Sequence, residues 1–217
     1  MAAMQRIRTV SIAIVFSVLL IPIANAHHHE APTYVPAGSV NAEQLIGPPP
    51  PDGSEAFKEG MAVVLWLQRT RTPEQVAFVE KPVNAERFAP ILGKDLFKVN
   101  GRALKKLLHD ATHQARADYD RLKAVYDQKR PAEVSDKVKP VGTHHTATAY
   151  PSGHTIRAIL YARLLAAVFP QHETALLDLA KRIAYGRVIA GQHYPIDITA
   201  GLTLGHAYAD VILKQPA

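Results

Sequence analysis

The 217-residue chain contains no cysteine. This absence excludes a thiol nucleophile, disulfide bonds and zinc sites built on cysteine. The sequence also lacks a period-two strand pattern, an internal repeat, and any low-complexity tract apart from four prolines at 48–51. Its net charge of +6 is scattered along the chain and forms no basic run, so it does not indicate nucleic-acid binding. A mildly basic protein does suit an anionic substrate.

The first 26 residues have the pattern of a secretory signal peptide. Arg6 and Arg8 form a positive start, residues 10–23 are apolar, and Ala24-Asn25-Ala26 provides a small-residue cleavage site. The apolar run is short for a membrane span, which favours cleavage over a retained anchor. Cleavage after Ala26 removes 26 of the 217 residues and two of the six net positive charges, which leaves 191 residues and a charge of +4. We therefore expect an exported protein, periplasmic or secreted, that makes no membrane contact after cleavage.

Residues 27–53 are expected to form an irregular, proline-rich segment, because the prolines at 48–51 favour an extended spacer. The segment begins with three consecutive histidines, His27-His28-His29. They are not spaced for one helix face, and no carboxylate cluster accompanies them. Adventitious metal binding is therefore the favoured interpretation, and no metal site is predicted.

Residues 54–217 carry the signals of helices. Ser54 is a candidate N-cap, and Thr72-Pro73 combines a cap with a proline at the first helical position. Gly201 and Gly205 would permit close approach of the last helix to a neighbour. Apolar residues at spacings of three and four predict a long helix over 101–128, followed by helices over 155–169, 173–189 and 195–213. The sequence therefore predicts one all-α domain, a compact helical bundle.

A cation, an imidazole and a carboxylate lie close together in the stretch 186–197, as Arg187, His193 and Asp197. Pro195 suits the first position of a helix, so His193 should lie just before a helix start, where unpaired backbone N–H groups favour an anion. Asp197, one turn away, could hold one ring nitrogen of His193 and leave the other free to attack. Alone, the stretch could equally be a basic surface turn with an incidental carboxylate.

Two further stretches carry polar residues at the ends of predicted helices. Lys123 and Arg130 are seven residues apart, a spacing of two helical turns that lets both side chains point the same way. Pro131 disfavours helix at Arg130, which should therefore lie at the helix exit. Two cations with this spacing are also common on solvated helix faces.

The stretch 149–155 precedes a richly apolar helix. Ser152 offers a hydroxyl, and Gly153 lets the backbone approach a ligand closely. His154 follows at the helix start, although a helix cap with a chance histidine would look the same. His144 and His145 are interpreted as loop residues.

In chain order the three stretches read Lys-x6-Arg-Pro, Pro-Ser-Gly-His and Arg-x5-His-x3-Asp. This arrangement resembles the phosphatidic acid phosphatase type 2 superfamily, which includes the vanadium haloperoxidases, and within it the bacterial class A non-specific acid phosphatases. The motifs cover residues 123–197, and a similar helical pattern extends over most of the mature chain. The family usually has serine where Gly186 stands, and often an aromatic residue after Arg-Pro, where Ala132 stands.

The resemblance implies metal-independent hydrolysis of a broad range of phosphomonoesters at acidic pH, without a cofactor, in a site between core helices and their connecting loops. It implies that His193 is the nucleophile that forms a phosphohistidine, that Asp197 orients it, and that His154 is the general acid and base. Inorganic phosphate or vanadate would be ligands, and a homo-oligomer is implied by resemblance alone. The residues expected to bind the phosphate group are Lys123, Arg130, Ser152, Gly153 and Arg187.

Three other functions stay open at this point. A vanadate-dependent haloperoxidase would use the same anion site, although 191 residues is short for one. Hydrolysis of lipid phosphates is disfavoured, because the mature chain offers no predicted spanning helix. A non-catalytic exported protein that binds phosphate or a metal ion would show binding without turnover.

Overall fold

The computed structural model describes residues 32–143 and 148–215, and the chain from Thr33 onward forms one compact unit. This part of the chain contains helices and no strand, so the all-α prediction is confirmed. The expected signal peptide, His27–His29 and His144–His145 lie outside the described residues. The domain boundaries after residues 26 and 53 stay predictions.

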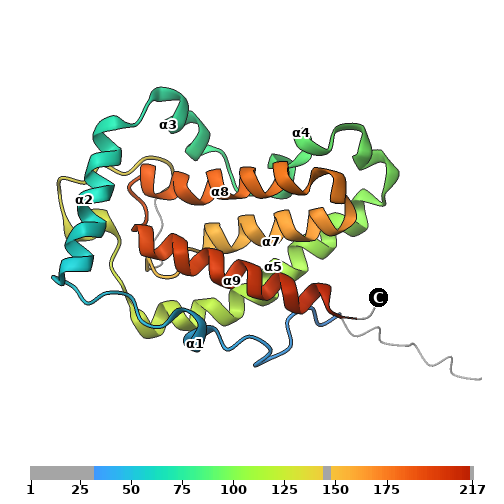
Figure 1. Cartoon of the computed structure of the whole chain (residues 1–217), viewed down its shortest axis with the longest axis horizontal. Helices are drawn as coiled ribbons and strands as arrows, with labels where there is room; N and C mark the ends of the chain where they lie inside the picture. Colours follow the sequence, from blue (N-terminus) through green and yellow to red (C-terminus); the bar gives the residue numbers. More distant parts are fainter. Residues whose placement is uncertain (1–31, 144–147, 216–217) are drawn as a thin grey trace, which may run out of the picture. The chain divides into compact units, whose positions relative to one another are not determined.

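Long helices dominate the described unit, and short ones connect them (Figure 1). One short helix, α1, falls in the segment that was expected to be irregular. In chain order the elements are α1 (Ala42–Ile46), α2 (Glu55–Thr70), α3 (Pro73–Glu80), η1 (Ala85–Arg87), α4 (Ala89–Leu92), η2 (Gly93–Lys98), α5 (Gly101–Tyr126), α6 (Pro131–Val134), α7 (Gly153–Val168), η3 (Pro170–His172), α8 (Glu173–Ile189) and α9 (Pro195–Leu213), where η marks 3-10 helices.

The helix starts follow the capping residues of the sequence. Ser54 Oγ accepts a hydrogen bond from the Phe57 amide, Thr72 and Gln75 form a capping box, and Pro195 is the first residue of α9. The capping side chains accept hydrogen bonds from backbone N–H groups that a helix start leaves unpaired. Proline has no backbone N–H, so it removes one of these unpaired groups. The predicted starts near Ser54, Thr72 and Pro195 are therefore confirmed.

The end of α5 differs from the prediction. The helix stops at Tyr126 because Asp127 adopts the left-handed conformation, with φ of 42°, and its amide donates to Lys123 O. Arg130 therefore lies beyond the helix, as the residue before α6. Arg130 lies outside the helix, as the proline after it predicted. It does not share a helix with Lys123, so the spacing of two helical turns does not explain why both side chains reach the site.

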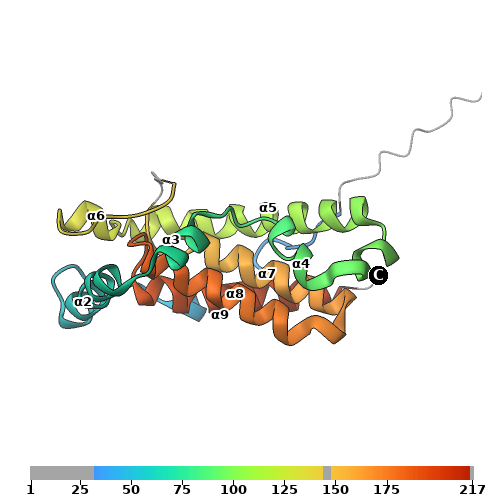
Figure 2. The ribbon, with the colours of Figure 1, turned by 90° about the horizontal axis from the view of Figure 1, so that it is seen from above.

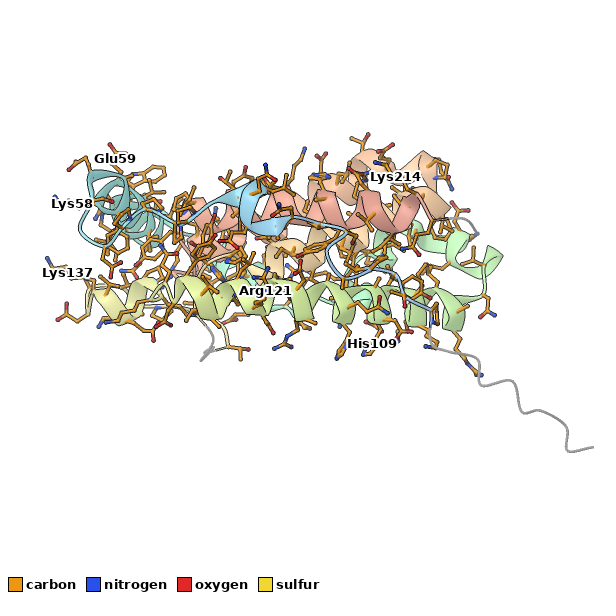
Figure 3. All side chains as sticks on the ribbon, turned by 90° about the horizontal axis from the view of Figure 1, so that it is seen from below. Lys58, Glu59, His109, Arg121, Lys137 and Lys214 are labelled. Carbon is orange, nitrogen blue, oxygen red and sulfur yellow. The ribbon has the colours of Figure 1, made fainter. Side chains whose placement is uncertain are left out.

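Helix α7 is the central element, since it packs against α8 and α9 and also contacts α5. Figure 1 shows α7, α8 and α9 side by side, and Figure 2 shows α5 as a layer along one side of them. The buried apolar residues of α7 are distributed around the helix and do not form a single stripe, which is the pattern of a helix enclosed by neighbours. Charged side chains such as Lys58, Arg121 and Lys214 project outward instead (Figure 3).

The starts of α7 and α9 are held against each other. A Cβ atom on Gly201 would lie 2.8 Å from Thr155 Cβ, so glycine is needed for this approach. The Ser152 amide also donates to Asp197 O at 3.1 Å, which joins the two helix starts directly. Packing and one backbone hydrogen bond thus bring together two stretches that are about 45 residues apart in sequence.

Candidate active site

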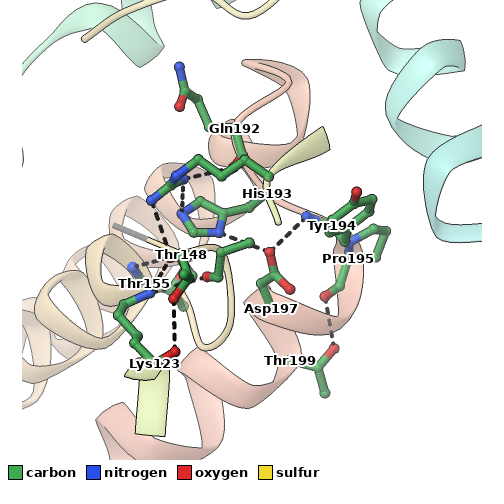
Figure 4. Close-up of polar contacts among 12 residues, drawn as sticks. Lys123, Thr148, Thr155, Gln192, His193, Tyr194, Pro195, Asp197 and Thr199 are labelled. Carbon is green, nitrogen blue, oxygen red and sulfur yellow. Dashed lines mark hydrogen bonds and ion pairs between the residues drawn. The ribbon is translucent and has the colours of Figure 1, made fainter. Parts of the chain in front are cut away.

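His193 and Asp197 form a buried hydrogen-bonded pair at the start of α9 (Figure 4). His193 Nδ1 lies 2.9 Å from Asp197 Oδ2, and the Tyr194 amide donates to the same oxygen, also at 2.9 Å. Asp197 is the third residue of α9, and both side chains are almost completely buried. Because Oδ2 accepts from Nδ1–H, the lone pair of the imidazole is on Nε2.

Arg130 faces that second ring nitrogen. Its Nη1 atom lies 3.2 Å from His193 Nε2 and donates to Gln192 O at 2.8 Å. The carboxylate oxygen of Glu133 accepts from the Arg130 backbone amide at 2.6 Å. The imidazole therefore lies between a carboxylate on one side and a guanidinium on the other.

Lys123 comes from the last turn of α5. Its Nζ donates to Thr148 O at 2.8 Å and to Ala149 O at 3.3 Å, and Thr148 Oγ1 donates back to Lys123 O at 3.0 Å. These contacts fasten the end of α5 to the segment that leads into α7. They are made to neutral carbonyl groups, so they leave the positive charge of Lys123 uncompensated at close range.

Arg187 is buried in the last turn of α8, with 5% of its surface exposed. Its Nε and Nη2 atoms have no hydrogen-bond partner among the described residues. Burial and, to a smaller extent, the nearby charges of Arg130 and Arg87 lower the pKa of Arg187 to about 10. A buried guanidinium is costly unless an acceptor pairs with it, so this group favours binding of an anion.

The turn before α7 supplies the remaining candidates. Ser152 is the N-cap of α7, and its Oγ accepts from Thr155 Oγ1 at 3.0 Å. Gly153 begins the helix, and a Cβ atom there would lie 3.2 Å from Tyr119 Oη. His154 follows, partly buried. Glycine at this position thus lets α7 start directly against α5.

A cavity of about 220 Å³ opens between these elements. Five of the eight predicted site residues line this cavity, and the other three lie next to it. Asp197 contacts the far side of His193, and Ser152 donates its backbone amide to Asp197 O. Arg187 is close enough that its charge lowers the pKa of His193. The lining residues are Arg116, Tyr119, Asp120, Lys123, Arg130, Gly153, His154, Arg157 and His193.

The electrostatics of the cavity keep the imidazole uncharged. Burial lowers the pKa of His193 well below its ordinary value, and the charges of Arg130, Lys123 and Arg187 act in the same direction. Burial raises the pKa of Asp197 to about 7, although the Tyr194 amide opposes this shift. His193 is therefore neutral with its lone pair on Nε2, the form in which an imidazole acts as a nucleophile.

Sequence reasoning did not identify four of the lining residues, Arg116, Tyr119, Asp120 and Arg157. Arg157 follows His154 by three residues on α7, a spacing that puts both on one helix face and could have identified it. The other three lie on α5 within two turns before Lys123, but nothing in the sequence marks that face as the one that lines a cavity.

The structure also explains glycine at position 186. A Cβ atom there would lie 2.8 Å from Val79 Cγ1 of α3. A serine would therefore collide with α3, so the close packing of α3 on α8 requires glycine at this position.

Among the described residues, no group of three or more histidine, aspartate or glutamate side chains is placed to hold a metal ion. Metal independence stays a prediction.

Comparison with known proteins identifies the family. Residues 107–217 match the model of the PAP2 superfamily, so the chain belongs to this superfamily of phosphatases, as the three motifs predicted. The chain is 26% identical over 212 residues to a non-specific acid phosphatase of Salmonella typhimurium, covering 88% of this chain and 82% of that protein. It is 29% identical over 128 residues to a lipid A 1-phosphatase of Rhizobium johnstonii, covering 48% and 52%. The chain thus spans about half the length of the lipid A 1-phosphatases that it matches.

A solved structure shares the fold. The transmembrane PAP2 type phosphatidylglycerolphosphate phosphatase from Bacillus subtilis aligns with a TM-score of 0.57 at 19% identity, covering 74% of this chain and 86% of that one. The expectation of a periplasmic or secreted protein is contradicted by these comparisons, since this neighbour is described as transmembrane and two relatives are lipid A 1-phosphatases. The described helices include none with both the length and the apolarity to cross a bilayer.

Proposed function

We propose that this protein hydrolyses phosphomonoesters through a phosphohistidine formed on His193. The observation that carries the proposal is the neutral, buried imidazole whose Nε2 faces a cavity lined by Lys123 and Arg130, with Arg187 close by. A phosphate ester is doubly negative and repels nucleophiles unless cations neutralise it. At about 4 Å and an effective dielectric constant near 20, each cation contributes roughly 4 kcal/mol of gross attraction before desolvation.

Substrate binding would also expose the nucleophile. In the described structure Arg130 Nη1 lies 3.2 Å from the Nε2 lone pair of His193. The oxygens of a bound phosphate are stronger acceptors than a neutral imidazole, because they are ionised and can take both guanidinium nitrogens at once. Arg130 would then turn to the phosphate, and Nε2 would be left to attack phosphorus. The Ser152 hydroxyl and the Gly153 amide would bind the remaining oxygens at the start of α7.

The chemistry follows in two displacements. His193 Nε2 bonds to phosphorus while the ester P–O bond breaks, and His154 gives its proton to the departing alkoxide. The imidazole then carries a positive charge, which favours the ionised form of Asp197, and the Asp197 carboxylate stabilises that charge. In the second step His154 takes a proton from water, the water oxygen bonds to phosphorus, and the N–P bond breaks to release inorganic phosphate. Because His154 must begin the cycle protonated, activity should be highest at acidic pH.

A broad substrate range fits the small cavity, which mainly surrounds the phosphoryl group. The acid phosphatase relatives support this proposal better than the lipid A 1-phosphatases, because the alignment with them covers 82% and 74% of their length and most of this chain. Inorganic phosphate and vanadate would be ligands of the same site. No metal or cofactor takes part in the proposed cycle.

The decisive variant is His193→Ala, assayed with 4-nitrophenyl phosphate. We expect kcat to fall by at least 10³-fold, because the nucleophile is lost, and the matched variant His109→Ala, which removes an exposed histidine on α5, to keep full activity. Rapid acid-free quenching of the wild-type protein with a ³²P-labelled substrate should trap a phosphoenzyme that is stable in base and labile in acid. Chelators should leave turnover unchanged, and vanadate should inhibit it.

Full-rate turnover by His193→Ala, or an acid-stable phosphoenzyme, would refute the nucleophile assignment. Reversible loss of activity in chelator would refute metal independence. Oxidation of bromide by peroxide in the presence of vanadate, without phosphatase activity, would instead identify a haloperoxidase.

A further inference from the structure

Arg157 is a cation of the cavity that the proposed cycle does not use. It lies on α7 three residues after His154, and it lines the same cavity as Lys123, Arg130 and His193. Its Nε atom is buried without a hydrogen-bond partner among the described residues, Nη1 donates to Val83 O at 3.4 Å, and the guanidinium also interacts with the Tyr119 side chain. A guanidinium has five N–H donors, so this group is poorly satisfied.

The neighbouring arginine differs in this respect. Arg116 is exposed, and its Nε lies 2.9 Å from Asp120 Oδ2 in an ion pair along α5. Arg157 forms no ion pair within the described residues. Of the two arginines in the cavity wall outside the phosphate site, Arg157 is therefore the one whose charge no carboxylate balances.

Its position relative to the reaction is fixed by His154. The charges that lower the pKa of His193 come from Arg130, Lys123, Arg187 and His154, whereas the charge of Arg157 acts on Tyr119. His154, as general acid, must face the oxygen of the departing alcohol. Arg157 lies one turn further along the same face of α7 and lines the same cavity, so it is a neighbour of the general acid that the alcohol must face as it leaves.

We propose that Arg157 binds a second anionic group in the leaving alcohol, so that the preferred substrates are phosphomonoesters whose alcohol carries a carboxylate or a further phosphate. This inference rests on the proposed function and names the substrate class of the same site. A planar guanidinium binds either anion through two parallel hydrogen bonds. The phosphoryl group itself is held by Lys123, Arg130 and Arg187, and Arg157 discriminates between alcohols.

The test uses pairs of substrates that differ only in charge. A series of ω-(phosphonooxy)alkanoates with two to five carbons is compared with the matched ω-(phosphonooxy)alkanamides. For wild type we expect kcat/KM of the acid to exceed that of the amide by about tenfold at the best chain length, and Arg157→Gln to reduce this ratio to near one. Arg157→Lys keeps the positive charge but loses the two parallel N–H donors of the guanidinium, and it should retain part of the preference. Arg116→Gln should leave the ratio within twofold, because Asp120 already pairs with Arg116.

Inhibition by inorganic phosphate serves as the readout for the phosphoryl group alone. Its inhibition constant should change less than twofold in Arg157→Gln, since phosphate has no leaving group. The proposal is overturned if wild type prefers no acid at any chain length, if the preference survives Arg157→Gln, or if the variant loses acid, amide and phosphate binding equally. Failure of the proposed function would be visible separately, as absence of turnover of every substrate in the wild-type protein. A thermal melt of each variant shows that it is folded.

Discussion

Lys123 shows what burial does to a single cation in this site. The side chain is 8% exposed and hydrogen-bonds to two carbonyl oxygens. Burial, followed by the charge of Arg130, lowers its pKa to about 8, and the charges of Asp197 and Asp120 only partly oppose the shift. In the free enzyme the positive charge of Lys123 is therefore lost as the pH rises through about 8, some two units below the value of an ordinary lysine.

This shift predicts a second break in the basic limb of the pH profile. Loss of the His154 proton already lowers kcat/KM on the way up from acidic pH, and we expect a steeper decline above about pH 8 in wild type, because the charge of Lys123 that attracts phosphate is lost there. Lys123→Arg keeps its charge at all accessible pH values, so this second break should move up by more than one pH unit while the first stays in place. The measurement is kcat/KM for a phosphomonoester from pH 4 to 10 in both proteins. An unchanged second break in the arginine variant would mean that another group titrates there.

Single residues of the site differ in how far the sequence could predict them. The pairing of His193 with Asp197 was predictable because both lie in one helix start, where a cap and a spacing of four residues fix the geometry locally. Arg157 carries an equally clear spacing from His154, but the sequence does not say which face of α7 meets a cavity. Arg130 reaches the site through the bend at Asp127, which no glycine marks in the sequence.

At the scale of elements, the junction of α7 and α9 positions the reacting groups. Gly201 and Gly205 lie one turn apart on α9, and a Cβ atom on either would lie 2.8 Å from a Cβ atom of α7. The two contacts differ only in where they fall. At Gly201 the contacted residues are Ser152 and Thr155, which flank the cavity-lining Gly153 and His154, whereas Gly205 contacts Ile159 in the core.

The glycine pair therefore separates the effects of packing on stability and on catalysis. Gly201→Ala and Gly205→Ala should each destabilise the fold by about 1–3 kcal/mol, because both force the same two helices apart. Gly201→Ala should in addition lower kcat/KM by tenfold or more, since Ser152 and the adjoining helix start move relative to His193. Gly205→Ala should keep kcat/KM within a factor of two below its melting range. Chemical denaturation and steady-state assays of both variants measure the two effects.

Equal losses of activity in the two variants would show that α9 transmits any displacement along its whole length. The sequence suggested close packing at these glycines, but it did not identify the partner helix. The same limit applies to Gly186, whose contact with Val79 of α3 depends on the tertiary arrangement. Helix starts were predictable from caps and prolines, because those signals are local, whereas the choice of neighbours depends on the whole chain.

At the scale of the whole molecule, the site is a source of instability in the empty protein. Lys123, Arg130 and Arg187 are all buried, and burial lowers the pKa of each of them. Near them, Asp197 is a buried carboxylate, so the described site carries an excess of buried positive charge. Such an excess opposes folding, and an anion that binds only the folded state removes this opposition. Phosphate should therefore stabilise the folded protein by an amount that depends on its concentration. At one hundred times its dissociation constant the gain is about 2.7 kcal/mol, or roughly 5–10 °C in Tm for a chain of this size.

Arg187→Met isolates this effect, because methionine fills similar space without a charge and two guanidinium nitrogens of Arg187 have no partner among the described residues. In phosphate-free buffer we expect the variant to melt a few degrees higher than wild type, while its turnover is largely lost and its response to phosphate is reduced at least by half. The control Arg102→Met removes an exposed arginine and should change neither value. Differential scanning calorimetry across a phosphate titration gives both quantities. If Arg187→Met melted lower than wild type without phosphate, Arg187 would have to be a structural cation with a satisfied partner, and the instability of the empty site could not be traced to it.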